Sequence, residues 1–318
     1  MRFIKDNNAS AFMVINAILW GSSYIWSKML LGYLPYFTIL FIFSLGGLAM
    51  LSILFFRQIR SIDKHTVLIG VGIGCLSILS NIFCMLALKS TSSSNTAFIV
   101  QMSVVLTPLI MAIAERRLPG KRVVFSVLIS MAGLLLLTCD FSNFRVNPGD
   151  LYALANALFF SLYLAALRIY SGKTDPAQFT FIQHATSSAV FLGMALIFEF
   201  RQINYSQFNS LALVILVIST AISVSTILIQ SSAIKFVRPE KATIIYTLEP
   251  VTAAVLAYVL IGERLAGGRA LVGCALILCA IAVTVYRKRI SMRAVGIDKG
   301  IESAGNIGIA GNNGSVSA

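Results

Sequence analysis

The chain has 318 residues, of which 58% are hydrophobic and 12% are charged, whereas about a quarter of the residues in an ordinary soluble domain are charged. One soluble core cannot bury that much apolar surface, so the composition excludes a soluble globular protein and favours a polytopic membrane protein. The net charge of +13 would also suit a nucleic-acid-binding protein, but no basic stripe interleaved with aromatic residues appears. We expect no nucleic-acid partner.

Ten apolar spans follow one another along the chain, each about 18 to 25 residues long, which is the length of a helix that crosses a bilayer. The connections between them are mostly short and hold most of the charge. We therefore predict an all-α integral membrane fold with ten transmembrane helices. The expected helices are 11–31, 36–56, 66–88, 92–114, 121–139, 150–170, 177–199, 209–233, 241–261 and 268–286.

The basic residues predict how these helices are oriented. If the N-terminus lies in the cytoplasm, 19 of the 25 Lys and Arg residues fall on the cytoplasmic side. Cytoplasmic loops of membrane proteins carry such an excess of Lys and Arg. We therefore expect a multi-pass protein of the cell (inner) membrane with both termini in the cytoplasm. Residues 288–318 contain much Gly, Asn and Ser and are expected to form a disordered cytoplasmic tail.

Short matches recur in the same order in the two halves of the chain. Asn16-Ala17 matches Asn156-Ala157 at an offset of 140 residues, and Glu115-Arg116 matches Glu263-Arg264 at an offset of 148. Each half holds five expected helices, an odd number, so the second half enters the membrane from the opposite side. The pattern predicts two inverted five-helix repeats. The expected segments are an N-terminus at 1–10, a first repeat at 11–139, a linker at 140–149, a second repeat at 150–287 and a tail at 288–318.

The expected helix at 241–261 carries Glu249 and Pro250 near its middle. A carboxylate at that depth is costly unless it has a partner or lies in a wet cavity, and proline removes a backbone donor and loosens the helix. Glu249 either binds substrate or a coupling proton, or it bonds to a neighbouring helix and holds the break; the two roles can coexist. In the first half, Gln101 aligns with Glu249, and a proline follows later, at Pro108.

Polar and aromatic residues share one face of the first expected helix. Asn16, Trp20, Tyr24 and Ser27 recur at spacings of four, four and three residues. Polar groups on a membrane helix normally turn away from lipid, and aromatic rings can stack on an apolar or cationic substrate. An aromatic belt at the membrane interface is the alternative. The sixth expected helix repeats the pattern with Tyr152, Asn156 and Tyr163.

Three further polar residues lie inside apolar spans. His184 could titrate as a proton relay, although a neutral histidine bonded to another helix is the preferred explanation. Asn81 and Gln230 are candidate cavity donors, with interhelical packing bonds as the alternative. No phosphate-binding glycine loop, zinc motif or Ser/His/Asp set is visible, so we expect no catalytic residues, no metal and no cofactor.

These features together resemble the drug/metabolite transporter superfamily in its EamA-type branch. The resemblance is carried by ten helices in two five-helix repeats, by Ala17–Tyr24 followed by Lys28, and by Leu248-Glu249-Pro250 followed by Gly262–Leu265. Members of this superfamily move amino acids, other small metabolites, toxic cations or, in eukaryotic relatives, nucleotide sugars. The first repeat departs from the pattern because Gln101-Met102 stands where Glu249-Pro250 would align.

The resemblance implies a secondary-active transporter that exports or exchanges a small organic metabolite, such as an amino acid, by alternating access. In that mechanism, the two five-helix halves would rock about a central cavity. A multidrug exporter of lipophilic cations is the alternative, followed by an integral-membrane enzyme or a regulatory scaffold, and a homo-oligomer stays open. The expected substrate-binding residues are Trp20, Tyr24, Asn81, Gln101, Asn156, Tyr163, Gln230, Tyr246 and Glu249, and the expected coupling or gating residues are Glu249, Pro250 and His184.

Overall fold

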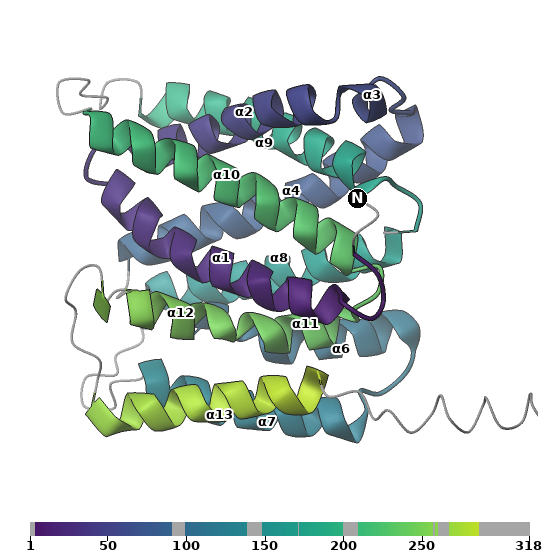
Figure 1. Ribbon diagram of the computed structural model, residues 1–318, viewed down its shortest axis with the longest axis vertical. Coiled ribbons are helices and arrows are strands. Elements are labelled where there is room, and N and C mark those ends of the chain that lie inside the picture. The colour runs from purple at the N-terminus through teal and green to yellow at the C-terminus, as the bar shows by residue number, and fades with distance from the viewer. Residues whose placement is uncertain are drawn as a thin grey trace, which may run out of the picture. The chain divides into compact units, whose positions relative to one another are not determined.

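The computed structural model describes residues 4–90, 99–138, 148–170, 172–199, 209–256, 258–259 and 267–285. The regular structure in these ranges is helical (Figure 1). Met1–Thr284 form one compact unit, to which everything below refers, and Val285–Ala318 are a second unit. The side chains of Tyr24, Lys28 and Lys89, the expected linker up to residue 147, Glu263-Arg264 and the expected tail lie outside the described residues.

Each expected span overlaps a helix. The first half contains α1 (Ala9–Leu30), α2 (Tyr36–Leu54), α3 (Phe56–Ile59), α4 (Lys64–Ser90), α6 (Ser103–Glu115) and α7 (Lys121–Thr138). The second half contains α8 (Pro148–Tyr170), α9 (Pro176–Phe198), α10 (Ser210–Ala233), α11 (Pro239–Tyr246), α12 (Leu248–Leu256) and α13 (Gly267–Val285). In the part of the chain that is described, α1, α2, α4, α8, α9 and α10 are long and apolar enough to cross a membrane.

Two of the expected spans are interrupted rather than continuous. The span at 241–261 is divided at Thr247 into α11 and α12, because Pro250 has no N–H for the carbonyl of Tyr246, four residues earlier, and its ring would crowd that carbonyl. The span at 92–114 has a turn at Gln101-Met102 before α6 begins. The described chain is therefore not a set of ten uninterrupted membrane-length helices.

The two halves of the chain are interleaved. Helix α4 packs on α8 and α9, α2 packs on α9, α1 packs on α10 and α12, and α6 packs on α8 and α11. Figure 1 shows α1 running between α10 on one side and α11 and α12 on the other. In the described residues, the main packing is thus between the halves, so the halves are not two separate bundles.

The closest approach of α1 to α12 occurs at Gly21. A Cβ atom at this position would lie 2.7 Å from the backbone oxygen of Glu249 and 2.7 Å from the Cβ of Thr252. Backbone atoms cannot move aside cheaply, so only glycine permits this contact. Gly21 therefore brings the first helix directly against the segment that carries Glu249.

Hydrogen bonds between connecting segments hold neighbouring helix ends together. The side chain of Gln178 donates to the carbonyl of Gln58 at 2.8 Å, and Lys235 Nζ donates to the carbonyl of Thr174 at 3.0 Å. The charge count predicts that all of these segments lie on one side of the membrane. Lys235 thus binds a neighbouring connection, and its burial lowers the pKa of its ammonium group despite the opposing effect of Asp175.

Candidate functional site

The hydroxyl of Tyr246, the last residue of α11, joins three helices. It accepts hydrogen bonds from Asn16 Nδ2 of α1 at 3.1 Å and from Gln230 Nε2 of α10 at 3.0 Å, and it donates to Met13 Sδ at 3.1 Å. A phenol has one hydrogen and can accept two bonds, so this hydroxyl is fully satisfied. All four residues are buried. The candidate site is built around this hydroxyl.

The amide oxygens of Asn16 and Gln230 have no hydrogen-bond partner among the described residues, although both side chains are fully buried. Their nitrogen atoms donate to the Tyr246 hydroxyl. The single hydrogen of that hydroxyl is donated to Met13, so Tyr246 cannot donate to either amide oxygen. An unsatisfied buried acceptor costs about 1–3 kcal/mol. Two such oxygens at one hydroxyl suit a ligand that brings N–H or O–H donors.

Aromatic rings surround the same residue. The ring of Trp20 lies 5.5 Å from the rings of both Tyr246 and Phe160. Phe160 in turn lies 6.1 Å from Tyr246 and 6.2 Å from Tyr163. We call Trp20, Phe160, Tyr163 and Tyr246 the aromatic cluster. Such rings can hold an apolar or cationic group. Phe160 was missed in the sequence, yet its spacings of four from Asn156 and three to Tyr163 would have found it.

Glu249 lies three residues after Tyr246, in the first turn of α12, and is 6% exposed. No hydrogen bond or ion pair connects its carboxylate to any residue within the described ranges. A helix N-terminus favours a negative charge, but a buried carboxylate still needs donors or water. Like the oxygens of Asn16 and Gln230, the carboxylate is an acceptor available to a donor-bearing ligand.

Gln101 connects the two interruptions of the fold. Its Nε2 atom lies 3.5 Å from the carbonyl oxygen of Tyr246, a long and therefore weak hydrogen bond. This is the carbonyl that Pro250 leaves without an N–H donor. Gln101 therefore supports the break in the other half of the chain.

Other expected site residues bind elsewhere. Asn156 Nδ2 donates to the carbonyl of Ser80 at 2.7 Å and to its hydroxyl at 2.9 Å, which ties α8 to α4. The hydroxyl of Tyr163 donates to Gln183 Oε1 of α9 at 3.3 Å. Asn81 has an exposed side chain. The structure brings Tyr163 to the aromatic cluster, but no hydrogen bond or ring contact within the described ranges joins Asn81 or Asn156 to Tyr246.

His184 lies at the contact between α9 and α2. Its Nδ1 is 3.0 Å from the carbonyl oxygen of Thr180, one turn earlier in the same helix. A Cβ atom at Gly47 of α2 would lie 2.1 Å from the His184 ring, so the ring packs directly against that helix. This geometry favours a packing role, with a bond inside α9 rather than to another helix.

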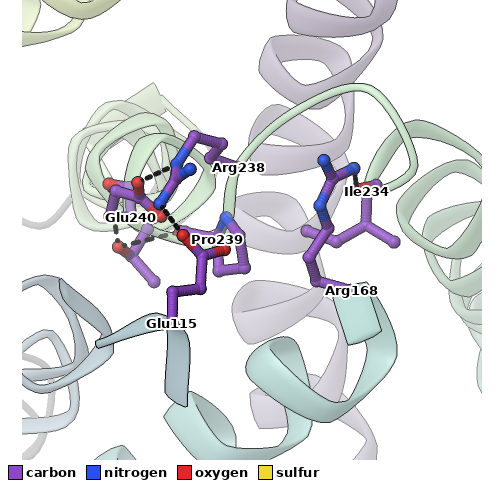
Figure 2. Close-up of polar contacts among 7 residues, drawn as sticks. Glu115, Arg168, Ile234, Arg238, Pro239 and Glu240 are labelled. Carbon is purple, nitrogen blue, oxygen red and sulfur yellow. Dashed lines mark hydrogen bonds and ion pairs between the residues drawn. The ribbon is translucent and has the colours of Figure 1, made fainter. Parts of the chain in front are cut away.

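Two charged groups missed in the sequence connect distant segments. Arg238, just before α11, pairs with Glu115 at the end of α6 at 2.7 Å and also with Glu240 (Figure 2). These two carboxylates raise the pKa of the Arg238 guanidinium, mainly through the hydrogen bond with Glu240. Only the fold brings Arg238 to Glu115, because 123 residues separate the two.

Glu199 is the other missed group. It follows α9, is 2% exposed, and accepts hydrogen bonds from the backbone N–H groups of Phe37 and Thr38 and from the Thr38 hydroxyl, at 2.8 to 2.9 Å. The carboxylate thus caps the N-terminus of α2 from 161 residues away in the sequence. Within the described ranges, no three His, Cys, Asp or Glu side chains are grouped as metal ligands.

Comparisons with known proteins give a consistent picture. The model of the EamA-like transporter family matches residues 8–139 and 147–286. An "Uncharacterized transporter" of Archaeoglobus fulgidus is 26% identical over 262 residues, which cover 82% of this chain and 81% of the relative. A solved crystal structure has a TM-score of 0.71 at 20% identity and covers 87% of this chain and 96% of its own. That last likeness shows the fold alone.

Proposed function

This chain belongs to the EamA-like transporter family, and we propose that it is a secondary-active carrier that exports or exchanges a small organic metabolite, such as an amino acid. The observation that carries the proposal is the set of buried acceptors beside the aromatic cluster. The amide oxygens of Asn16 and Gln230 are buried without a hydrogen-bond partner among the described residues, and the carboxylate of Glu249, which is 6% exposed, accepts no hydrogen bond from them. An ammonium group would supply the missing donors, and the rings of Trp20 and Tyr246 would hold the cation or an apolar side chain.

We assign the residue roles on the same basis. Glu249, Gln230, Trp20 and Tyr246 would bind the substrate, and Tyr24 is proposed with them from its place on the first helix. Pro250 would let α11 and α12 tilt at Thr247, where the helix is already interrupted. Glu249 could also carry a coupling proton.

The proposed topology is ten spans in two inverted repeats in the cell (inner) membrane, with both termini in the cytoplasm. One match of the family model in each half supports the repeats. The division of the connections into two sides is supported by hydrogen bonds that join segments of the same predicted side, and the orientation is supported by the excess of Lys and Arg on one of these sides. The interleaved packing means that alternating access would separate particular helix pairs, since the halves are not separate bundles.

The test compares metabolites inside and outside cells that overproduce the wild type, Glu249→Gln or, as a matched control, Asp63→Asn, whose carboxylate only caps the start of α4. The wild type and the control should move the same small set of compounds, and Glu249→Gln should lose it. If Glu249→Gln moves those compounds equally well, Glu249 has an architectural role. If none of the three proteins moves any compound while all are folded in the membrane, metabolite export is wrong.

The aromatic cluster also supports a second function, export of lipophilic cations, because its rings would accept a quaternary ammonium ion. The unpaired amide oxygens distinguish the two, because a quaternary ion has no N–H to donate to them. Competition between primary amines and their quaternary analogues for transport would distinguish the metabolite carrier from the exporter of lipophilic cations. Preference for the primary amine supports the metabolite carrier, and preference for the quaternary ion supports the drug exporter.

A further inference from the structure

Arg238 makes an ion-pair bridge between the two halves of the chain. It is the residue before α11 and contacts Glu115, the last residue of α6, and Glu240, in the first turn of α11 (Figure 2). The Arg238 and Glu115 side chains are 45% and 33% exposed, whereas that of Glu240 is 6% exposed. The bridge therefore lies at the surface and covers a buried acid.

The connection that carries Arg238 is fixed to the second half. The guanidinium of Arg168, at the end of α8, donates to the carbonyl of Ile234 (Figure 2). It also donates to the carbonyl of Lys235. Lys235 in turn donates to the carbonyl of Thr174. Arg238 thus extends from an anchored connection to α6, which packs on α11 together with α1 and α7. Breaking the Arg238–Glu115 pair would free this end of α6, while the connection between α10 and α11 would stay held by Arg168 and Thr174.

A polar stripe follows this bridge along α11. Glu240, Thr243 and Thr247 are spaced by three and four residues, which places them on one face, and all are buried. The second carboxylate oxygen of Glu240 has no hydrogen-bond partner in the described part of the chain. On α6, the buried hydroxyl of Thr107 has none either. The hydroxyls of Thr243 and Thr247 donate to carbonyls of α11 itself, so the oxygen of Glu240 is the group on this face that is costly unless water can reach it.

The contact between α2 and α9 is different because it is tied at both ends. Glu199 binds the start of α2, and Gln178 at the other end of α9 binds the connection after α2, at Gln58 and Ser61. For α6 and α11, the direct polar contacts within the described ranges are the bridge at Arg238 and the weak bond from Gln101. Unlike the α2–α9 contact, the α6–α11 contact can therefore open from the Arg238 end.

We propose that the Arg238–Glu115 pair is a gate that closes a polar path between α6 and α11, leading along Glu240, Thr243 and Thr247 to Glu249. This gate rests on the proposed transport function. When the pair separates, α6 moves away from α11, water reaches Glu240, and the path to the Tyr246 hydroxyl and Glu249 opens at this end. When the pair forms, that end is closed.

The test measures how fast a hydrophilic maleimide labels a buried cysteine in nanodiscs, where both faces of the bilayer are accessible. Thr243→Cys is made in a background that lacks the five native cysteines, because Thr243 is buried one turn beyond Glu240. Arg238→Ala should increase its labelling rate about fivefold, the shift expected when a modest ion-pair interaction is lost from a two-state equilibrium. Added salt should raise the rate when Arg238 is present and have little effect in its absence.

Three controls make the result specific. Gln178→Ala removes a bond between the halves at the same end and should not change the labelling of Thr243→Cys. Thr180→Cys, equally buried in α9, should stay unlabelled whether or not Arg238 is present. If Arg238→Ala does not fold, Glu115→Gln gives the same test with a smaller increase. The path between α6 and α11 is excluded if folded Arg238→Ala and Glu115→Gln both leave labelling unchanged, or if Gln178→Ala raises it equally.

The experiment needs no substrate, so it separates the gate from the carrier. An increase in labelling without any transported metabolite would support the gate and count against the proposed substrate class. Transport that depends on Glu249, without an increase in labelling, would leave the carrier standing and overturn the gate.

Discussion

Two buried glutamates of the second half, Glu199 and Glu249, have opposite surroundings. The Glu199 carboxylate accepts three hydrogen bonds from the start of α2. The Glu249 carboxylate, at the start of α12, accepts none from the described residues, although it is 6% exposed. The two carboxylates are similarly buried, so they differ in the number of hydrogen bonds that they accept.

The difference indicates what each carboxylate does. A buried charge with several hydrogen bonds holds structure together, because removing it leaves the donors unpaired. A buried charge without partners costs stability and is retained only where a ligand, a proton or water satisfies it. Glu199 is thus part of the scaffold formed by α2 and α9, and Glu249 belongs to the site. The two kinds of role should separate in experiments on stability and transport.

The largest effect on stability is expected for Glu199→Ala, which removes the acceptor of three hydrogen bonds. We expect the free energy of unfolding in detergent to fall by about 3 kcal/mol, since hydrogen bonds to charged groups contribute more than neutral ones. Glu199→Gln keeps one acceptor oxygen and should lie between the alanine variant and the wild type. Unfolding curves that coincide for all three proteins would show that the cap of α2 is unimportant.

The next effect is expected for Gly21→Ala, at the contact between α1 and α12. The added Cβ atom meets the backbone oxygen of Glu249 at 2.7 Å, so we expect a loss of about 2 kcal/mol in unfolding free energy together with reduced transport. Gly72→Ala is the matched control, because a Cβ there meets nothing within 4 Å. Equal effects of the two substitutions would contradict the close approach of α1 to Glu249.

A smaller effect is expected for Tyr246→Phe. The variant keeps the ring against Trp20 but leaves the amide nitrogens of Asn16 and Gln230 without their acceptor, and we expect a loss of about 1–2 kcal/mol. Transport should fall further than stability, because both amides can then rotate and no longer present their oxygens. Michaelis constants and maximal rates in vesicles would measure this once a substrate is known. An unchanged Michaelis constant would argue against substrate contact by the amides.

The smallest effect on stability is expected for Glu249→Gln. No donor among the described residues is left unpaired, so the free energy of unfolding should change by less than about 0.5 kcal/mol, while transport is lost. Thermal unfolding measured beside Glu199→Gln provides the direct comparison. If Glu249→Gln were the less stable of the two, Glu249 would be the structural carboxylate instead.

The residues of the candidate site were only partly predictable. Spacing on one helical face selected Trp20, and polarity inside an apolar span selected Gln230 and Glu249; Tyr246 was named beside Glu249 without an argument from spacing. The same two rules also selected Asn156 and Asn81, which no hydrogen bond or ring contact among the described residues joins to Tyr246. Spacing shows which residues share a face of their own helix, but it does not show which other helix that face meets.

The sequence by itself determined the membrane class and the approximate positions of the long apolar helices, because apolar length is a property of local segments. The break after Tyr246 also follows from the sequence, since Pro250 cannot supply the missing N–H. Only the tertiary structure decided which polar groups meet: Asn16 with Tyr246, Glu199 with α2, and Arg238 with Glu115. Apolar helix faces can pack in many ways, whereas hydrogen bonds need defined distances and angles. These polar contacts are therefore known only once the helices are placed in three dimensions.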